Sequence, residues 1–206
     1  MKKKHFYDGF SIYTGIILFL SVVLLHYGNR FYHVEAGLMI EIREKLHFFH
    51  SLFLWIATYM NLYLLTAVII GILYVMHKVN IAYWILGNVI IVGLGCNYLL
   101  KNLFQRERPA VLTPFIQEYS YSYPSGSALV CTLLFGGLLL VSTQLIKHKY
   151  YRLFFQIMMI ISIILVVLSR IYVGVHYPTD VLAGILFGFS SLLISRFLLK
   201  DFLRNG

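Results

Sequence analysis

Two apolar runs near the C-terminus are separated by the stretch Ser169-Arg170-Ile171-Tyr172-Val173-Gly174-Val175-His176-Tyr177-Pro178-Thr179-Asp180. It places an arginine, a histidine and an aspartate where a membrane helix is expected to end. Polar groups also stand at the ends of other apolar runs, in residues 101–109 and 123–127. We therefore interpret the apolar runs as a scaffold that brings these three polar stretches together.

The composition indicates an integral membrane protein. Of 206 residues, 60% are hydrophobic and only 12% are charged, and the mean hydropathy is +0.80. A soluble domain is closer to half apolar and a quarter charged, so the excess apolar surface is expected to face a lipid bilayer. The net charge of +9 does not indicate a nucleic-acid partner, because the basic residues lie in short loops between apolar runs.

The apolar runs predict an all-α, polytopic membrane protein, a bundle of six transmembrane helices forming one domain over residues 1–206. Each run is near the ~20 residues that a helix needs to cross a bilayer. The predicted spans are residues 10–27, 51–76, 81–100, 126–146, 153–168 and 181–199. Residues 28–50 predict an amphipathic helix between the first two spans, with an apolar stripe made by Val34, Leu38, Ile42, Leu46 and Phe49.

The distribution of Lys and Arg predicts the orientation. With a cytoplasmic N-terminus, ten of the 17 basic residues fall on the cytoplasmic side and seven on the other. Short loops rich in Lys and Arg stay inside. Both termini are therefore expected in the cytoplasm, and the three polar stretches on the outer face of a bacterial plasma membrane.

On that face, three cations are expected to converge near one histidine. Lys101 ends the third span, Arg108 follows it, and Arg170 ends the fifth span. Such a cluster beside the helix start at Ser125-Gly126 suits a phosphate, because guanidinium groups and free backbone N–H groups bind its oxygens.

His176 and Asp180 are four residues apart, which on a helix places them on one face. A carboxylate that accepts from one ring nitrogen fixes the tautomer and leaves the other nitrogen free. This arrangement suits a nucleophilic histidine that attacks phosphorus, with the cations stabilising the charge on the phosphoryl oxygens.

The three stretches resemble the motifs of the type 2 phosphatidic acid phosphatase family of membrane lipid phosphatases. Residues 101–109 match K-x6-R-P, residues 169–180 contain S-R-x5-H-x3-D, and residues 123–127 contain P-S-G followed by Ser where the family has His. Together the motifs extend over residues 101–180. Their order and spacing make the joint pattern specific, whereas any one of them alone is weak.

The resemblance implies roles for individual residues. Lys101, Arg108 and Arg170 are expected to bind phosphate, and Ser125 and the Gly126 backbone to donate to its oxygens. His176 is expected to form a phosphohistidine, and Asp180 to orient it. The similar enzymes need no metal or other cofactor; Cys96 and Cys131 lie in apolar runs without metal-ligand spacing.

Ser127 departs from the family pattern, which has a histidine that protonates the leaving group at this position. A serine hydroxyl is a poor proton donor near neutral pH, and losing general-acid help typically costs about 10²–10⁴-fold in rate. Three explanations remain open: an engineered replacement, a substrate whose leaving group needs little protonation, or a non-catalytic protein that binds lipids.

The predicted function is removal of phosphate from a membrane lipid phosphate or diphosphate. Undecaprenyl diphosphate is the first candidate, because its leaving group is a phosphate; phosphatidylglycerophosphate, phosphatidate and lipid A phosphate are alternatives. Transfer of the phosphate to a second lipid, or binding or transport of a lipid phosphate without catalysis, are the competing functions. The sequence does not indicate an oligomeric state.

The remaining polar and aromatic residues near the motifs are given structural interpretations. Arg30, Arg43 and Arg106 are expected to anchor helix ends at the membrane surface, and Glu107 and Glu118 to pair with cations or face water. Aromatic side chains near the polar stretches are interpreted as interfacial, with some of them lining the way in for a lipid headgroup: Phe115, Tyr119, Tyr121, Tyr123 and Tyr172.

Overall fold

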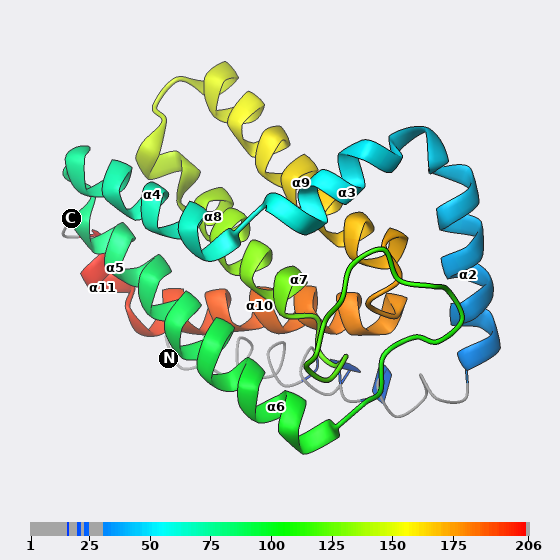
Figure 1. The fold of residues 1–206 in the computed structure, drawn as a ribbon. Coiled ribbons are helices and arrows are strands. Elements are labelled where there is room, and N and C mark those ends of the chain that lie inside the picture. Colours follow the sequence, from blue (N-terminus) through cyan, green and yellow to red (C-terminus); the bar gives the residue numbers. More distant parts are fainter. Residues whose placement is uncertain (1–15, 17–19, 22, 25–30, 205–206) are drawn as a thin grey trace.

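The computed structural model describes residues 16, 20–21, 23–24 and 31–204, and this part of the chain contains helices and no strand (Figure 1). The elements in chain order are α2 (Tyr32–Lys45), η1 (His47–Phe49), α3 (His50–Tyr59), α4 (Leu62–Val75), α5 (Val79–Asn88), η2 (Val89–Cys96), α6 (Asn97–Phe104), α7 (Gly126–Cys131), η3 (Thr132–Gly136), α8 (Gly137–Leu145), α9 (Lys149–Tyr172), α10 (Pro178–Leu198) and α11 (Lys200–Arg204). The all-α prediction is confirmed for these residues.

Four helices are long and apolar enough to cross a membrane: Val79–Phe104, Gly126–Leu145, Lys149–Tyr172 and Pro178–Leu198. They correspond to the last four predicted spans. The first two of them each run through a π-helical stretch, η2 or η3, without a break. The predicted first span, residues 10–27, lies largely outside the described residues.

The predicted span 51–76 is not one straight helix. The helices His47–Tyr59 and Leu62–Val75 meet at an angle of 75°, and they count as a fifth span only if the bent pair crosses the membrane as one. The break is at Asn61, whose side chain accepts hydrogen bonds from the backbone N–H groups of Tyr63 and Leu64. An asparagine that caps two N–H groups starts a new helix, and an average over hydropathy does not detect this change of direction.

A helix, α2, does lie between the first two predicted spans, and its predicted apolar stripe turns only partly into the protein, since Ile42 and Leu46 are half-buried. Val34 and Leu38 are exposed, whereas the buried residues of α2 are Glu35, Ala36 and Met39. On the inward face, Glu35 pairs with the guanidinium of Arg106 at 2.7 Å. Apolar periodicity alone gives no signal for such a contact.

The helix Gly126–Leu145 lies at the centre, since 72% of its apolar 18-residue stretch is buried inside the protein, against at most 39% for the corresponding stretches of the other three spans. It packs closely on α10 through two glycines. A Cβ atom at Gly184 would lie 2.7 Å from the Ser125 carbonyl oxygen, and one at Gly188 would lie 2.8 Å from the Thr132 side chain. Small residues permit such close helix contacts in membranes, and this contact fixes the start of α7 against the start of α10.

The ends of α6 and α9 and the starts of α7 and α10 meet at one end of the molecule, where the loop of residues 105–125 crosses them (Figure 1). Backbone hydrogen bonds tie this end together, from Ser125 N to the Asp180 carbonyl oxygen (3.0 Å) and from Phe115 N to the Val173 carbonyl oxygen (3.0 Å). The turn after α9 needs a glycine, because Gly174 has a φ of +85°.

Candidate active site

A cavity of about 360 Å³ lies at this end of the helices. Six of the eight residues singled out from the sequence line it: Lys101, Arg108, Gly126, Ser127, Arg170 and His176. The other two, Ser125 and Asp180, are fully buried and are not among the lining residues. The structure therefore brings the three polar stretches together around one space.

His176 lies in the turn that precedes α10, so the expected placement of His176 and Asp180 on one helix is wrong. Pro178 opens α10, and a proline disfavours the helical conformation of the residue before it. The two side chains still meet across the helix start, with 3.6 Å between His176 Nδ1 and Asp180 Oδ2. Asp180 Oδ2 also accepts a hydrogen bond from Tyr177 N (2.9 Å), which caps α10.

Ser122 is a site residue that the sequence reasoning missed. Its hydroxyl donates to Asp180 Oδ2 at 2.5 Å and lies 3.4 Å from His176 Nδ1. Ser122 is fully buried, and its hydroxyl lies between the imidazole of His176 and the carboxylate of Asp180. A serine in a loop is too common to stand out in the sequence.

The imidazole of His176 is neutral in this surrounding. Its side chain is buried, and burial lowers the pKa of His176 to about 4, although Asp180 acts in the opposite direction. Desolvation disfavours the charged form of a histidine. A neutral ring whose Nδ1 faces Ser122 and Asp180 has its Nε2 lone pair available for a nucleophilic attack.

Arg106 is not a membrane-surface anchor, which corrects the interpretation from the sequence. Its side chain is buried; Nη1 donates to Asp180 Oδ1 at 2.6 Å and Nη2 donates to Glu35 Oε2 at 2.7 Å. The guanidinium carbon lies 4.1 Å from the centre of the Tyr177 ring. Arg43 is not an anchor either, because it donates to the backbone oxygens of Tyr172 and Thr113.

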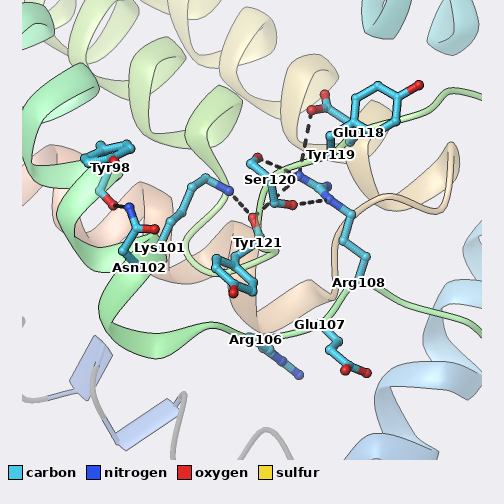
Figure 2. A pocket seen from close by; sticks show the side chains of 10 residues that line it. All are labelled: Tyr98, Lys101, Asn102, Arg106, Glu107, Arg108, Glu118, Tyr119, Ser120 and Tyr121. Atoms are coloured by element: carbon cyan, nitrogen blue, oxygen red, sulfur yellow. Dashed lines mark hydrogen bonds and ion pairs between the residues drawn. The ribbon is translucent and has the colours of Figure 1, made fainter.

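The loop of residues 105–125 contacts the three cations of the cavity, and Figure 2 shows two of them, Lys101 and Arg108. Lys101 donates to the Tyr121 carbonyl oxygen, and Arg108 Nε donates to the Ser120 carbonyl oxygen at 2.7 Å. The Glu118 carboxylate lies 3.7 Å from Arg108 Nη2 and 3.6 Å from Arg170 Nη1. A carboxylate thus lies against the two guanidinium groups that the sequence assigns to phosphate.

A second cavity, of about 610 Å³, adjoins the first and shares Lys101, Arg108, Glu118 and Ser120 with it (Figure 2). Tyr119 and Tyr121 line it and are exposed. Tyr123 and Tyr172, expected at the membrane surface, are instead fully buried. The hydroxyl of Tyr172 lies 3.0 Å from His50 Nδ1, and the Tyr123 ring packs edge-on against Phe104; these contacts hold the two rings inside.

Among the described residues, no group of three or more His, Cys, Asp or Glu side chains is placed to hold a metal ion.

The family model described as the PAP2 superfamily matches residues 82–203, which is more than half of the chain. The chain belongs to the PAP2 superfamily. The resemblance to the type 2 phosphatidic acid phosphatases is thereby confirmed, and the chain is an integral membrane protein of a lipid phosphatase family.

Three curated PAP2 relatives are similar to parts of the chain. Phosphatidylglycerophosphatase B of Bacillus subtilis is 35% identical over 111 residues, which are 52% of this chain and 50% of that protein. Undecaprenyl-diphosphatase of Sulfolobus acidocaldarius is 46% identical over 68 residues, 33% of this chain and 29% of that protein. Lipid A 4'-phosphatase of Porphyromonas gingivalis is 31% identical over 131 residues, which are 59% of this chain and 52% of that protein. The chain thus spans about half or less of the length of these relatives.

The fold is similar to that of the crystal structure described as the first transmembrane PAP2 type phosphatidylglycerolphosphate phosphatase, from Bacillus subtilis. The TM-score is 0.70 at 21% identity, and the match covers 91% of this chain and 96% of that one. At this identity the likeness establishes the PAP2 fold only.

Proposed function

We propose that this chain removes phosphate from a lipid phosphate or diphosphate through a phosphohistidine intermediate. The observation that carries the proposal is the cavity of about 360 Å³, which is lined jointly by Lys101, Arg108, Arg170, Ser127 and His176. A nucleophile, its cationic phosphate ligands and the start of a helix share one space. Binding alone does not need an imidazole oriented by a buried carboxylate.

In the proposed reaction, His176 Nε2 attacks phosphorus and the P–N bond forms as the bond from phosphorus to the leaving oxygen breaks. Lys101, Arg108 and Arg170 hold the phosphoryl oxygens and stabilise their charge in the transition state. The N–H groups at the start of α7 donate to the same oxygens. A water molecule then hydrolyses the phosphohistidine, releasing inorganic phosphate and restoring the neutral imidazole.

The substrate proposed first is undecaprenyl diphosphate. Ser127 lies in the cavity where the family has its general acid, so a leaving group that needs little protonation is favoured. A lipid phosphate leaving from a lipid diphosphate meets this condition better than an alkoxide leaving from a monoester. The names of the three relatives include this substrate and two monoester lipids, phosphatidylglycerophosphate and lipid A phosphate.

We place the proposed active site on the outer face of a bacterial plasma membrane, with both termini in the cytoplasm and six membrane-spanning segments in one domain. This topology rests on the Lys and Arg distribution. It takes residues 10–27 as the first span and the bent pair α3–α4 as the second.

The proposal is tested by phosphate release from purified protein in lipid vesicles. The panel comprises undecaprenyl diphosphate, phosphatidylglycerophosphate, phosphatidate and a lipid A phosphate, each with the native chain, Ser127→His and His176→Ala. We expect release that His176→Ala abolishes. Ser127→His should raise turnover of the monoesters by more than that of the diphosphate, about 10²-fold for an alkoxide leaving group. Release that persists in His176→Ala contradicts the proposed nucleophile.

Ser127 is also the observation that favours a second function, binding or transport of a lipid phosphate without hydrolysis. This function predicts saturable binding of the same lipids to the native chain, with no phosphate release even in Ser127→His. Burst labelling of His176 without turnover would instead indicate a trapped phosphohistidine, and would support the phosphatase.

A further inference from the structure

A buried chain of charged groups leads away from the cavity behind Asp180. Asp180 Oδ1 pairs with Arg106 Nη1 at 2.6 Å, and Arg106 Nη2 pairs with Glu35 Oε2 at 2.7 Å. The exposed fractions of the three residues are 0%, 8% and 3%. Asp180 belongs to α10, Arg106 to the loop that follows α6, and Glu35 to α2. This Glu35–Arg106–Asp180 chain of charged groups therefore joins three segments that are distant in sequence.

Further contacts fix both ends of this chain. Glu35 Oε1 accepts from Thr179 N at 3.1 Å and from Thr179 Oγ1 at 2.6 Å. Arg106 Nη1 also donates to Thr179 Oγ1 at 2.8 Å, and the Tyr177 ring covers the guanidinium. Arg106 is therefore held at two of its nitrogens and across one face. Glu35 in turn is bound to the first turn of α10, the turn that carries Asp180.

The two oxygens of Asp180 have different partners. Oδ1 meets Arg106, whereas Oδ2 meets Ser122, Tyr177 N and the imidazole side of the site. A buried carboxylate needs compensation for its charge and for each of its lone pairs. Arg106 supplies a positive charge and a hydrogen bond to Oδ1. It thereby fixes the plane of the carboxylate and the direction in which Oδ2 faces the imidazole.

We propose that Glu35 and Arg106 are positioning residues for His176: Glu35 holds Arg106, Arg106 holds Asp180, and Asp180 orients the imidazole. The inference rests on the proposed phosphatase function. Glu35 lies outside residues 82–203, the part that the family model matches, and Arg106 occupies one of the unspecified positions of the motif in residues 101–109. Helix α2 is accordingly part of the catalytic apparatus.

The first test compares Glu35→Gln and Arg106→Lys with the matched control Glu41→Gln. Glu41 lies on the same helix, is exposed, and among the described residues pairs with Lys45 alone. Glu35→Gln and Arg106→Lys should each lower kcat by about 10–100-fold, because a small misplacement of the reacting imidazole costs this much. KM should change little, since the phosphate-binding cations are intact. A kcat equal to that of the native protein in both Glu35→Gln and Arg106→Lys would overturn the inference.

Chemical rescue separates positioning from general stability. Arg106 borders the cavity of about 610 Å³, so a guanidinium ion from solution has access to the space that Arg106→Ala leaves. We expect guanidinium at sub-denaturing concentration to restore part of kcat in Arg106→Ala, and ammonium at the same ionic strength not to. Equal effects of the two cations would contradict a positioning role for the guanidinium.

A readout without turnover keeps this inference distinct from the proposed function. If neither the native chain nor Ser127→His releases phosphate or becomes labelled at His176, the proposed function fails, and the inference is then judged by ¹⁵N NMR of the histidine rings. The signal of His176 is identified by its loss in His176→Ala. We expect one tautomer, protonated at Nδ1, in the native chain and in Glu41→Gln, and mixed tautomers in Arg106→Lys. Should Arg106→Lys not fold, Thr179→Val replaces it. An unchanged ring signal overturns the inference.

Discussion

Glu118 lies against two guanidinium groups of the proposed phosphate site. Its carboxylate lies 3.7 Å from Arg108 and 3.6 Å from Arg170, so an incoming phosphate has to displace it. We predict that Glu118→Gln lowers the inhibition constant of inorganic phosphate about fivefold, because a partly exposed ion pair is worth at most about 1 kcal/mol. Glu107→Gln is the control, because Glu107 is exposed and lines the second cavity, of about 610 Å³. A weaker inhibition by phosphate in Glu118→Gln would contradict this competition.

The protonation of His176 gives a prediction for the pH dependence. Burial lowers the pKa of His176 to about 4, below the ordinary value of about 6.5. A lowered pKa means that the ring takes up its proton only at more acidic pH, so it stays neutral between pH 5 and 8. The acid limb of kcat/KM should therefore follow the second ionisation of the substrate phosphate, which is near 6 for a monoester.

Two soluble substrates test this origin of the acid limb. An aryl phosphate and an alkyl phosphate differ in their second pKa, and the midpoint of the acid limb should shift with the substrate. A midpoint near pH 6.5 for both would mean that the imidazole itself titrates there, contrary to its buried position.

At the scale of the helices, the contact of α10 with α7 holds the site together. An alanine Cβ at position 184 would lie 2.7 Å from the backbone oxygen of Ser125 and 3.1 Å from the backbone nitrogen of Leu129. We expect Gly184→Ala to destabilise the fold by about 1–3 kcal/mol and to lower kcat, as α7 moves away from His176. Thermal unfolding in detergent, with phosphate release at a temperature where the variant is folded, measures both effects.

Gly71→Ala in α4 is the matched control, because nothing lies within 4 Å of its added Cβ atom. Alanine favours a helix over glycine by about 1 kcal/mol, so this variant should unfold at the same or a higher temperature. A similar loss of stability in both variants would show that close packing at Gly184 is not the cause.

At the scale of the whole molecule, the long apolar runs were the predictable part of the fold. Residues 126–146 and 181–199 were predicted as spans, and the structure has Gly126–Leu145 and Pro178–Leu198. The bend at Asn61 was not predicted, because hydropathy averaged along the chain contains no information on direction. The buried positions of Tyr123 and Tyr172 depend on neighbours from other helices, which a local pattern does not show.

The candidate site was predictable only where polar residues interrupt apolar runs. Lys101, Arg170 and His176 stand out for that reason, and the structure gathers them around one cavity. Glu35 and Arg106 are 71 residues apart in the chain, and the sequence around each gives no sign that the two residues meet. No periodicity distinguishes Glu35 from Glu41 or Glu44; its tertiary contacts with Arg106 and Thr179 do so.

The measurement that tests the central claim most directly is identification of the phosphorylated residue. The chain and its Ser127→His form are mixed with a lipid diphosphate labelled in its terminal phosphate, quenched in alkali, which preserves phosphohistidine, and analysed by mass spectrometry of the peptides. The account predicts phosphate on His176 and none in His176→Ala. Phosphate on another residue, or phosphate release that continues at the native rate in His176→Ala, would contradict it.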